Sequence, residues 1–290
     1  MSDPRASVIV PVSADPEGLD RTLSALADQT YADYEVLVVD NASTDETGAV
    51  ARRYADEFER VSALDCPIRG SYAARNEGIR NADGEILAFL DADVSVDPDW
   101  LASAVEAMES GGADYVGCRV EIEIERETPI ARYDRLVGFP VETYLREERF
   151  APTACLFVRR SVIEAVGPFD ETLVSGGDAE FGRRVDAAGF DLRYEPAVVV
   201  SHPARDSLRS FVGKYVRVGC GQYQRRDPDG GLRGAVRFLR RCLPPNPLAF
   251  RGRFDPPPSG RALLELYAVD TLRKYAKTAG YLLEGVRSRR

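Results

Sequence analysis

Short apolar runs alternate with segments of helical spacing over the first part of the chain. The runs "ASVIVPV" and "YEVLVVD" are almost entirely apolar, which is typical of strands that are buried on both faces. Leu19, Leu23 and Leu26 recur at the spacing of one helical face. This alternation predicts an α/β fold, with a mostly parallel central sheet and helices on both faces. We expect strands at 6–12, 34–40, 60–65 and 85–91, helices at 18–30 and 71–82, and a helix started by a capping box of Ser43 and Glu46.

The pattern loosens after residue 114, where apolar and charged residues mix more freely. The stretch "DYVGCRVEIEIE" alternates apolar and charged residues, as a half-exposed strand does. The remaining expected elements are a helical segment at 132–147, a strand at 153–160, a loop entering a helix at 176–190 and a strand at 191–203.

The composition changes after Pro203. Residues 1–200 contain 19 basic and 40 acidic side chains, whereas residues 201–290 contain 19 basic and 7 acidic ones. We therefore expect an α/β domain over 1–205 and a basic helical extension over 206–290. Two segments of the extension have apolar helical stripes, formed by Leu208, Phe211, Val212 and Tyr215 and by Leu272, Tyr275, Ala276, Ala279, Leu283 and Val286.

No apolar run is long enough to cross a bilayer. The longest, "ILAFL" and "AVVV", fall far short of the roughly 20 residues required, and no signal segment opens the chain. The five cysteines form no CxxC pair, and reduced thiols in a cytosol are the simplest interpretation. We expect a cytoplasmic protein with a net charge of −9 and no nucleic-acid partner.

Two aspartates, Asp91 and Asp93, directly follow the buried run "ILAFL". In a turn their carboxylates can approach one hard cation, and oxygen ligands of this type suit Mg²⁺ or Mn²⁺. A solvated acidic turn would contain the same residues, and the tripeptide alone does not decide between the two. Asp97 and Asp99 flank Pro98 before a helical segment, so we interpret them as helix-start residues.

Arg75 and Asp40 are candidates for contacts with a nucleotide. An arginine offers a rigid fork of donors to a diphosphate, although a surface salt bridge is the alternative for Arg75. Asp40 ends an expected strand, where it can accept a hydrogen bond from a base or a ribose, or simply cap the next loop. Ligands of such sheets bind beyond the carboxyl ends of the strands, which is where Asp40 and Asp91 stand.

Asp178 and Glu180 form a second acidic pair, in "SGGDAEFGRR". The residue types fit a general base beside a helper, and an acidic helix N-terminus would look the same. His202 is the only histidine, and it follows the run "PAVVV". It can ligate a metal or contact a phosphate, or it can be merely packed in the core.

Six segments, taken in order, resemble the family 2 glycosyltransferases, which are inverting enzymes of the Rossmann-like GT-A fold. They are "SVIVPV", "LADQTYADYEVLVVDNASTDET", "AARNEGI", "ILAFLDADV", "GGDAEFGRR" and "VVVSHP". The resemblance covers about residues 6 to 205. It implies a donor that is a UDP-, GDP- or dTDP-sugar and a Mn²⁺ or Mg²⁺ cofactor.

The resemblance also implies roles for particular residues. On the donor side, Arg75 would meet the diphosphate, and Asp91 of the family's DXD element would face the ribose. The metal would lie on Asp93, with His202 where related enzymes often carry a histidine. The remaining implied roles are the catalytic base for Asp178, the acceptor side for Glu180, and the nucleotide pocket for Pro11, Val12, Ser13, Asp40 and Ala92.

The chain departs from the family pattern at three places. Ser13-Ala14 stand where Tyr-Asn is common, and Gly177 stands where an acidic residue usually precedes the base. The QxxRW element of processive synthases is missing, because Arg226 replaces the tryptophan after Gln222 and Arg225. We therefore expect an enzyme that makes a single transfer.

The sequence thus predicts an inverting glycosyltransferase that acts in glycan or glycoconjugate assembly. Its acceptor would be a hydroxyl or a lipid-linked phosphate or glycan. A sugar-phosphate nucleotidyltransferase and a non-catalytic nucleotide-sugar-binding protein are the alternatives. No GxGxxG or GxxxxGK[ST] segment is present, which disfavours hydride transfer and P-loop chemistry.

The arginine-ringed stripes of the extension fit attachment to an anionic membrane surface or a lipid-phosphate acceptor. That would place the protein peripherally on the inner face of the cell membrane. The alternative is that these helices pack on the catalytic domain and merely expose their charge.

Overall fold

The computed structural model describes residues 4–225, 239–254, 256 and 258–288, and the chain forms two compact units. The first unit consists of Met1–Glu121, Phe139–Thr172 and Gly177–Pro203. The second consists of Ile122–Gly138, Leu173–Gly176 and Ala204–Arg290. The division of function between residues 1–205 and 206–290 stays a prediction.

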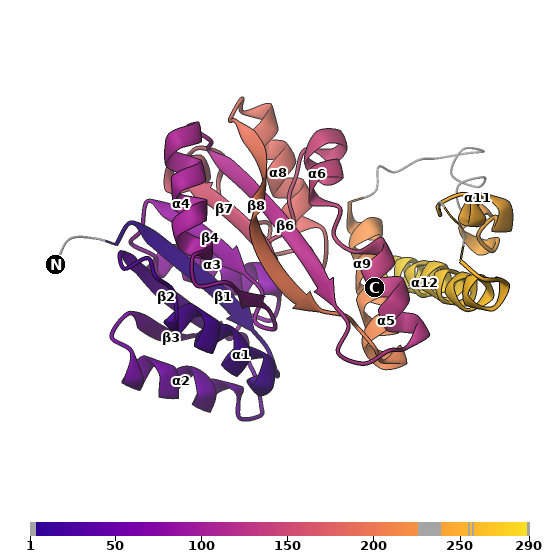
Figure 1. The fold of residues 1–290 in the computed structure, drawn as a ribbon, viewed down its shortest axis with the longest axis horizontal. Helices are drawn as coiled ribbons and strands as arrows, with labels where there is room; N and C mark the ends of the chain where they lie inside the picture. The colour runs from indigo at the N-terminus through magenta and orange to yellow at the C-terminus, as the bar shows by residue number, and fades with distance from the viewer. Residues whose placement is uncertain (1–3, 226–238, 255, 257, 289–290) are drawn as a thin grey trace. The chain divides into compact units, whose positions relative to one another are not determined.

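Four parallel strands form one half of an eight-stranded sheet in the first unit (Figure 1). In the order β3-β2-β1-β4 they are β3 (Val61–Asp65), β2 (Tyr34–Asp40), β1 (Ala6–Val12) and β4 (Ile86–Leu90). The core positions of the inner strands are fully buried, as apolar runs without alternation require. The four strands predicted from these runs are confirmed.

Four further strands complete the sheet, and several of their pairings are antiparallel. β7 (Cys155–Arg159) pairs with both β4 and β6 (Tyr115–Glu123). β8 (Leu192–Pro203) pairs with the two-residue strand β5 (Ser95–Val96) at the edge of the sheet. The predicted α/β fold is confirmed, and so are the strands expected at "DYVGCRVEIEIE", 153–160 and 191–203. The sheet is mixed because β7 and β5 pair antiparallel to their neighbours, a direction that was not predicted.

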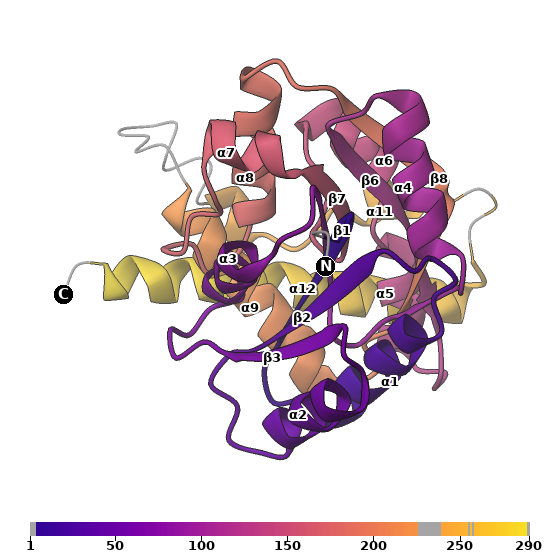
Figure 2. The same ribbon diagram turned by 90° about the vertical axis from the view of Figure 1, so that its left-hand side faces the viewer.

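Helices cover both faces of the sheet. Because α1 and α2 connect strands that advance in one direction and α3 returns in the other, right-handed crossovers place them on opposite faces. Figure 2 shows α3, α7 and α8 on one side of the strands and α1 and α4 on the other. The helices of this unit are α1 (Pro16–Ala27), α2 (Thr47–Glu57), α3 (Ser71–Asn81), α4 (Trp100–Gly111), α6 (Val141–Thr143), the π-helix η1 (Tyr144–Glu148), α7 (Arg160–Val166) and α8 (Gly177–Ala187).

The predicted capping box at Ser43 and Glu46 is wrong. Helix α2 begins at Thr47, and Glu46 occupies the N-cap position without a side-chain capping bond. Ser43 Oγ instead accepts the Ala14 N–H at 2.9 Å, so it joins two loops rather than starting a helix. Asp45 accepts the N–H and the hydroxyl of Thr47, and these bonds lower the pKa of its carboxyl.

The second unit is helical. It contains α5 (Pro129–Val137), α9 (Leu208–Gln224), α11 (Pro247–Arg251) and α12 (Gly260–Arg287). Gly219 of α9 lies against the Lys277 carbonyl, and Gly280 of α12 lies against the Val216 carbonyl, so closely that neither position has room for a Cβ. The two helices therefore pack backbone to backbone. Their core cluster consists of Tyr133, Phe211, Tyr215, Phe250, Leu266, Val269 and Ala276.

One expectation for the helical segments is wrong, and the sequence left the burial of the apolar stripes open. Residues 132–147 do not form one helix, because α5 ends before Gly138, which has a positive φ of 35°, and Pro140 follows. The expected apolar stripes are only partly buried. Phe211 and Tyr215 lie in the core, whereas Leu208 and most of the residues expected on the stripe of α12 are exposed or half-buried.

A buried network of charges lies within the second unit. Asp134, only 2% exposed, accepts the Arg205 N–H at 3.0 Å and pairs with Lys214 Nζ at 3.4 Å. Asp270 is fully buried and accepts from Arg273 Nε at 2.8 Å and from the Tyr133 hydroxyl. Each carboxylate is thus compensated locally, as buried charges must be.

This network predicts that stability rises with pH in the alkaline range. Burial and then the nearby Arg205 lower the pKa of Lys214 to about 8, and burial with Arg273 does the same for Lys277. Below pH 8 both lysines are charged in the folded and in the unfolded protein, so the folded protein bears the full free-energy cost of burying the two charges. Between pH 8 and 10.5 the unfolded chain binds more protons, so the free energy of unfolding increases, by roughly 1–3 kcal/mol.

Denaturant unfolding at several pH values measures this increase. In wild type the free energy of unfolding should increase above pH 8. The double variant Lys214→Met, Lys277→Met should not show this increase. Lys274→Met, which changes the third lysine, is the matched control and should keep it. Equal pH profiles for wild type and the double variant would contradict the prediction.

Candidate functional site

The carboxyl ends of the parallel strands bring three aspartates to one edge of the sheet. Asp40 ends β2, and its register partners are Val12 of β1 on one side and Asp65 of β3 on the other. Asp91 directly follows the last residue of β4. β4 pairs with β1 on the side of β1 that faces away from β2. The order and the parallel direction of these strands therefore bring the acidic residues together at the carboxyl ends of the strands, as predicted.

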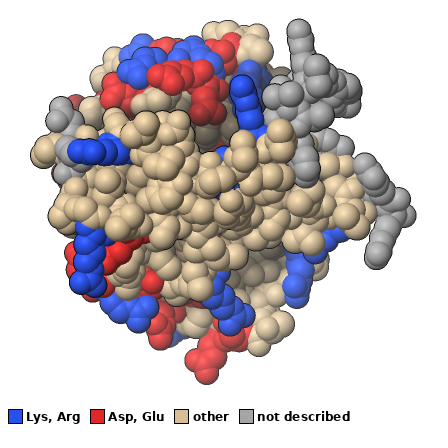
Figure 3. Space-filling model, turned by 90° about the vertical axis from the view of Figure 1, so that its right-hand side faces the viewer, with Lys and Arg blue, Asp and Glu red and all other residues tan. Residues whose placement is uncertain are grey.

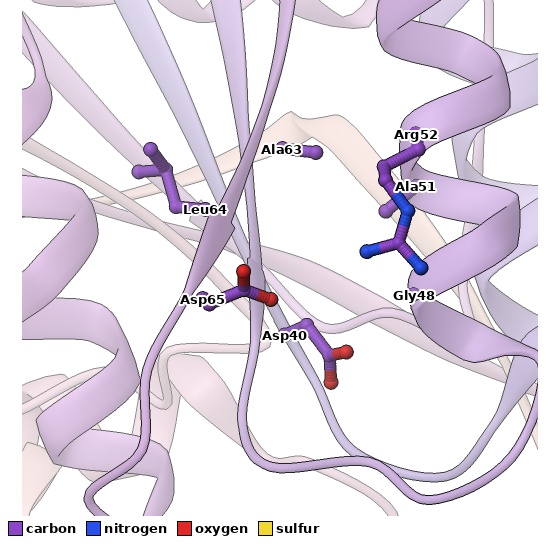
Figure 4. A pocket seen from close by; sticks show the side chains of 7 residues that line it. All are labelled: Asp40, Gly48, Ala51, Arg52, Ala63, Leu64 and Asp65. Carbon is purple, nitrogen blue, oxygen red and sulfur yellow. The ribbon is translucent and has the colours of Figure 1, made fainter.

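A small pocket opens between β2, β3 and α2 (Figure 4). The carboxylates of Asp40 and Asp65 lie on one side of it, and Arg52 reaches toward it from α2. Gly48 leaves room for the Asp40 carboxylate, because a Cβ there would lie 2.8 Å from Asp40 Oδ2 and the carboxylate would have to shift. The lining thus combines hydrogen-bond acceptors and donors. It consists of Asp40, Gly48, Ala51, Arg52, Ala63, Leu64 and Asp65.

Arg75 lies inside the protein, next to Asp91. Its side chain is 5% exposed, and Nη2 donates to Asp91 Oδ1 at 2.8 Å. Nη1 donates to the Ser71 carbonyl at 3.4 Å, whereas Nε is buried and has no hydrogen-bond partner within the described part of the chain. Leaving a buried donor unsatisfied costs about 1–3 kcal/mol, so this guanidinium is a ready donor for an anion.

Asp91, Asp93 and His202 form a cluster with the composition of a metal site. Each offers one ligand atom, and the three atoms lie within 4.8 Å of one another. His202 Nδ1 lies 2.9 Å from the Pro203 carbonyl oxygen, which can only accept, so Nδ1 carries a proton. In the neutral imidazole, Nε2 then presents its lone pair toward Asp93 Oδ1, 3.6 Å away. Two carboxylates and a lone pair that face one another fit a shared hard cation.

The pairing of β5 with β8 brings His202 close to Asp93. The loop after Asp93 enters β5, whose Ser95 and Val96 pair with Ser201 and Val200 of β8. His202 is therefore one residue beyond this pairing and is 2% exposed. Thr22 of α1 also fixes the loop, because its hydroxyl donates to the Val94 carbonyl at 2.7 Å and accepts the Val94 N–H at 3.0 Å.

Asp178 stands in the first turn of α8, held against Tyr72 of α3. The Tyr72 hydroxyl donates to Asp178 Oδ1 at 3.5 Å and accepts the Gly177 N–H at 2.8 Å. Burial, with the charge of Asp178 second, raises the pKa of Tyr72 to about 12, so the phenol remains a donor at neutral pH. The Arg75 guanidinium lies 5.8 Å from the centre of the Tyr72 ring, which connects the Asp178 region to Asp91.

The departure at Gly177 also has a structural reason. A Cβ on Gly177 would lie 2.7 Å from Cζ of Tyr72, so the ring occupies the space that a side chain would need. The tyrosine hydroxyl stands beside Asp178 in place of a preceding carboxylate. Sequence reasoning missed Tyr72, because its role depends on a contact between segments more than 100 residues apart.

Removal of the Tyr72 hydroxyl should affect turnover more than binding. Tyr72→Phe leaves the Gly177 N–H without its acceptor and removes the tyrosine hydroxyl as a donor to Asp178, so we expect kcat to fall about tenfold with an unchanged donor KM. Tyr34→Phe is the matched control, because its hydroxyl donates to the Leu26 carbonyl at 2.6 Å in a different part of the core. Steady-state kinetics of both variants test this, and a normal kcat for Tyr72→Phe would refute it.

Glu180 forms an ion pair within α8. Its carboxylate pairs with Arg184 through two bonds, Nε to Oε1 at 2.7 Å and Nη2 to Oε2 at 3.0 Å. Arg184 also donates to the carbonyls of Gly167 and Pro168, so the pair ties α8 to the preceding turn. The acceptor-side role of Glu180 stays a prediction.

The turn after β1 places the first group of predicted nucleotide residues. Pro11 is half-buried, Val12 is buried and Ser13 is exposed, and Ser13 Oγ donates to the Asn41 carbonyl at 3.2 Å. Asn41 in turn donates to the Ile68 carbonyl at 2.6 Å and accepts the Gly70 N–H at 2.8 Å. The turns that follow β1, β2 and β3 are therefore bonded together, and the buried Asn41 that joins them carried no signal in the sequence.

The other predicted residues fall outside this cluster or serve other contacts. Ala92 is buried between the two aspartates, and Asp99 occupies the N-cap position of α4 without a capping bond from its carboxylate. Gln222 and Arg225 lie on or just after α9 in the second unit, where Arg225 packs against Gly176. Arg226 lies outside the described residues.

Comparisons with known proteins agree on one family. The profile described as "Glycosyl transferase family 2" matches residues 7–167. "Glycosyltransferase AglE" from Haloferax volcanii is 40% identical over 225 residues, which cover 76% of this chain and 74% of AglE. A dolichyl N-acetyl-α-D-glucosaminyl phosphate diacetamido-dideoxy-glucuronosyltransferase from Methanococcus voltae is 24% identical over 231 residues, which cover 74% of this chain and 72% of that one.

Solved structures give the same fold. The mannosyltransferase PcManGT from Pyrobaculum calidifontis, in complex with GDP-Man and Mn²⁺, matches with a TM-score of 0.60 at 21% identity. The match covers 99% of this chain and 76% of that one. TarS 1–349 from S. aureus, in complex with UDP-GlcNAc, matches with a TM-score of 0.59 at 18% identity and covers 97% and 92% of the two chains.

Proposed function

The chain belongs to glycosyl transferase family 2 and is a glycosyltransferase of the GT-A fold, and we propose that it is a metal-dependent inverting enzyme that makes a single transfer. The observation that carries the proposal is the continuous contact from Asp178 through Tyr72 and Arg75 to Asp91. It joins the residue proposed as base to those proposed to hold the leaving group.

The proposed metal site consists of Asp91, Asp93 and His202, with Asp93 as the principal ligand. Bound Mn²⁺ or Mg²⁺ would supply Lewis-acid stabilisation of the charge on the departing nucleoside diphosphate. Arg75 binds the same diphosphate through its unsatisfied Nε, and its bond to Asp91 fixes the orientation of the guanidinium.

The transfer itself is proposed to be one displacement. Asp178 accepts the proton of the acceptor hydroxyl while the hydroxyl oxygen attacks the anomeric carbon. The bond from that carbon to the diphosphate oxygen breaks, and its electron pair leaves with the nucleoside diphosphate. Attack from the opposite face inverts the centre, so an α-linked donor gives a β-linked product.

The proposed donor is a UDP-, GDP- or dTDP-sugar. The pocket at Asp40 supports a polar base or ribose there. Pro11, Val12, Ser13 and the buried Ala92 of the DXD element are proposed as further residues of the nucleotide site. The similar structures were bound to GDP-Man and to UDP-GlcNAc, so they support nucleotide-sugar binding without favouring one base.

The proposed acceptor is a glycan or a lipid-linked phosphate or glycan, in glycoconjugate assembly. The dolichyl phosphate compound named for the Methanococcus voltae relative supports a lipid-linked acceptor. No helix of the described residues is long and apolar enough to cross a membrane. We propose a cytoplasmic enzyme that meets the acceptor peripherally, on the inner face of the cell membrane.

Donor turnover in the presence of Mn²⁺ tests the proposed reaction. Incubation with UDP-, GDP- and dTDP-sugars should give slow release of nucleoside diphosphate from one of them, with water as the acceptor. Exchange of pyrophosphate into the donor would instead indicate a nucleotidyltransferase. Binding with neither reaction would indicate a non-catalytic nucleotide-sugar-binding protein and would contradict the proposal.

A further inference from the structure

The outer face of α12, in the second unit, is apolar along nearly its whole length. At 100° per residue, six exposed side chains fall within a sector of about 60°, and they span about 33 Å of helix. Leu264 is 70% exposed, Leu282 46% and Val286 58%. We call this set the α12 outer face: Leu264, Ala268, Tyr275, Ala279, Leu282 and Val286.

No charged side chain interrupts the α12 outer face. Among the residues of α12 between Arg261 and Arg287, every exposed one is apolar or tyrosine, and Leu283 borders the face. Figure 3 shows this side of the molecule as a broad uncharged band with side chains of both charges at its edges. Exposed apolar surface of this extent on one helix marks an interaction site.

The packing of α12 keeps this face outward. On the opposite side, Gly280 lies against the Val216 carbonyl and Gly219 of α9 lies against the Lys277 carbonyl. Val269 and Ala276 of α12 are buried in the core cluster of the unit. Rotation of α12 to bury its outer leucines would separate the two helix backbones and expose this core.

The second unit has further exposed leucines, and an exposed arginine lies at the start of α12. Leu248 of α11 is 80% exposed, and Tyr267 of α12 donates to the Pro245 carbonyl at 2.7 Å just before that helix. Leu243 is 54% exposed, whereas Arg241 lies on the α9 side of α12, 4.2 Å from the centre of the Tyr281 ring and bonded to Gln222 of α9 at 3.0 Å. The Arg261 side chain is 92% exposed at the start of α12.

The positive charge of the second unit favours a negatively charged partner. The second unit carries 22 basic and 11 acidic side chains in its sequence, so a second copy would bring two positively charged units together. An anionic lipid bilayer offers acyl chains to the leucines and negative headgroups to the arginines. An amphipathic helix without spanning hydrophobicity, ringed by arginine, lies in the plane of such an interface.

We propose that α12 lies in the interfacial plane of an anionic lipid bilayer, with the α12 outer face buried in it and the flanking arginines on the headgroups. The role of this attachment rests on the proposed function, because a lipid-linked acceptor is reached from the membrane surface. The binding itself requires no sugar chemistry, so the two proposals can fail separately.

Vesicle flotation of the full chain tests the attachment. The protein should float with vesicles of phosphatidylcholine and phosphatidylglycerol in equal parts at low salt, less at high salt, and poorly with phosphatidylcholine alone. The triple variant Leu264→Gln, Leu282→Gln, Val286→Gln should partition about 100-fold more weakly. Leu136→Gln changes an exposed leucine of α5, 49% exposed, and should float like wild type.

Three outcomes would overturn the proposal. Wild type could remain unbound to the anionic vesicles, or the triple variant could float as well as wild type. A wild-type dimer that does not float and that the triple variant converts to a monomer would show that a second copy covers this face. Donor hydrolysis in solution, measured in parallel, should be equal in wild type and the triple variant; its loss in both would contradict the proposed function and leave the membrane result standing.

Discussion

Asp178→Asn is expected to lower kcat for sugar transfer about 1,000-fold and to leave donor affinity unchanged within about twofold. The amide has the size and shape of the carboxylate and can still accept the Ala179 N–H, which lies 3.0 Å from Asp178 Oδ1. It cannot accept the proton of an attacking hydroxyl. The change therefore removes proton transfer while α8 and its contacts with Tyr72 are retained.

Two measurements separate this expectation from a structural defect. Donor binding by calorimetry should be equal for wild type and Asp178→Asn, and single-turnover transfer should be lost only in the variant. Glu180→Gln is the informative comparison, because the pairing of Glu180 with Arg184 already occupies that carboxylate. If Glu180→Gln loses transfer and Asp178→Asn does not, the two assignments must be exchanged.

The parallel half of the sheet could be predicted because its strands are buried on both faces. Such strands read as unbroken apolar runs, and β2 was predicted with the bounds observed, Tyr34–Asp40. The strand order then brings Asp40 and Asp91 to one rim, so that part of the candidate site followed from local pattern and topology. Asp65 carried the same signal as Asp40, an acid at a strand end, and could have been found.

The residues that the sequence did not reveal act through long-range contacts. Tyr72 and Asp178 are 106 positions apart, and nothing in the local pattern around Tyr72 distinguishes it from a core aromatic residue. Asn41 joins three turns by bonds that no periodicity encodes. The capping box failed for a related reason, since Ser43 bonds Ala14 of another loop instead of its own helix.

Helical periodicity also could not distinguish the buried face of α12 from an exposed one. Ala276 lies in the core, but Tyr275 and Val286 of the same predicted stripe are exposed. Periodicity predicts an apolar stripe and does not show whether the stripe packs on the protein or binds a membrane. For α12 the close packing of Gly219 and Gly280 against α9 decides which side faces inward.

Asp93→Ala is expected to weaken Mn²⁺ binding about 100-fold or more, with a parallel loss of transfer at limiting metal. Asp93 offers its carboxylate to the cluster in which all three ligand atoms lie within 4.8 Å of one another. Its loss leaves only Asp91, already bonded to Arg75 at 2.8 Å, and His202. Asp97→Asn is the matched control, because it neutralises an aspartate of the same segment and should bind Mn²⁺ like wild type.

Stability measurements without substrate turnover give an independent readout of the same site. A cation that binds only the folded state raises the free energy of unfolding by about 2.7 kcal/mol at 100 times its Kd. Mn²⁺ with nucleoside diphosphate should therefore stabilise wild type and Asp97→Asn, and should stabilise Asp93→Ala little at the same concentrations. His202→Ala should lose part of the Mn²⁺-dependent increment if Nε2 is a ligand. If it only lowers the baseline stability and keeps the increment, His202 is a packed core residue and the metal lies on the two aspartates alone.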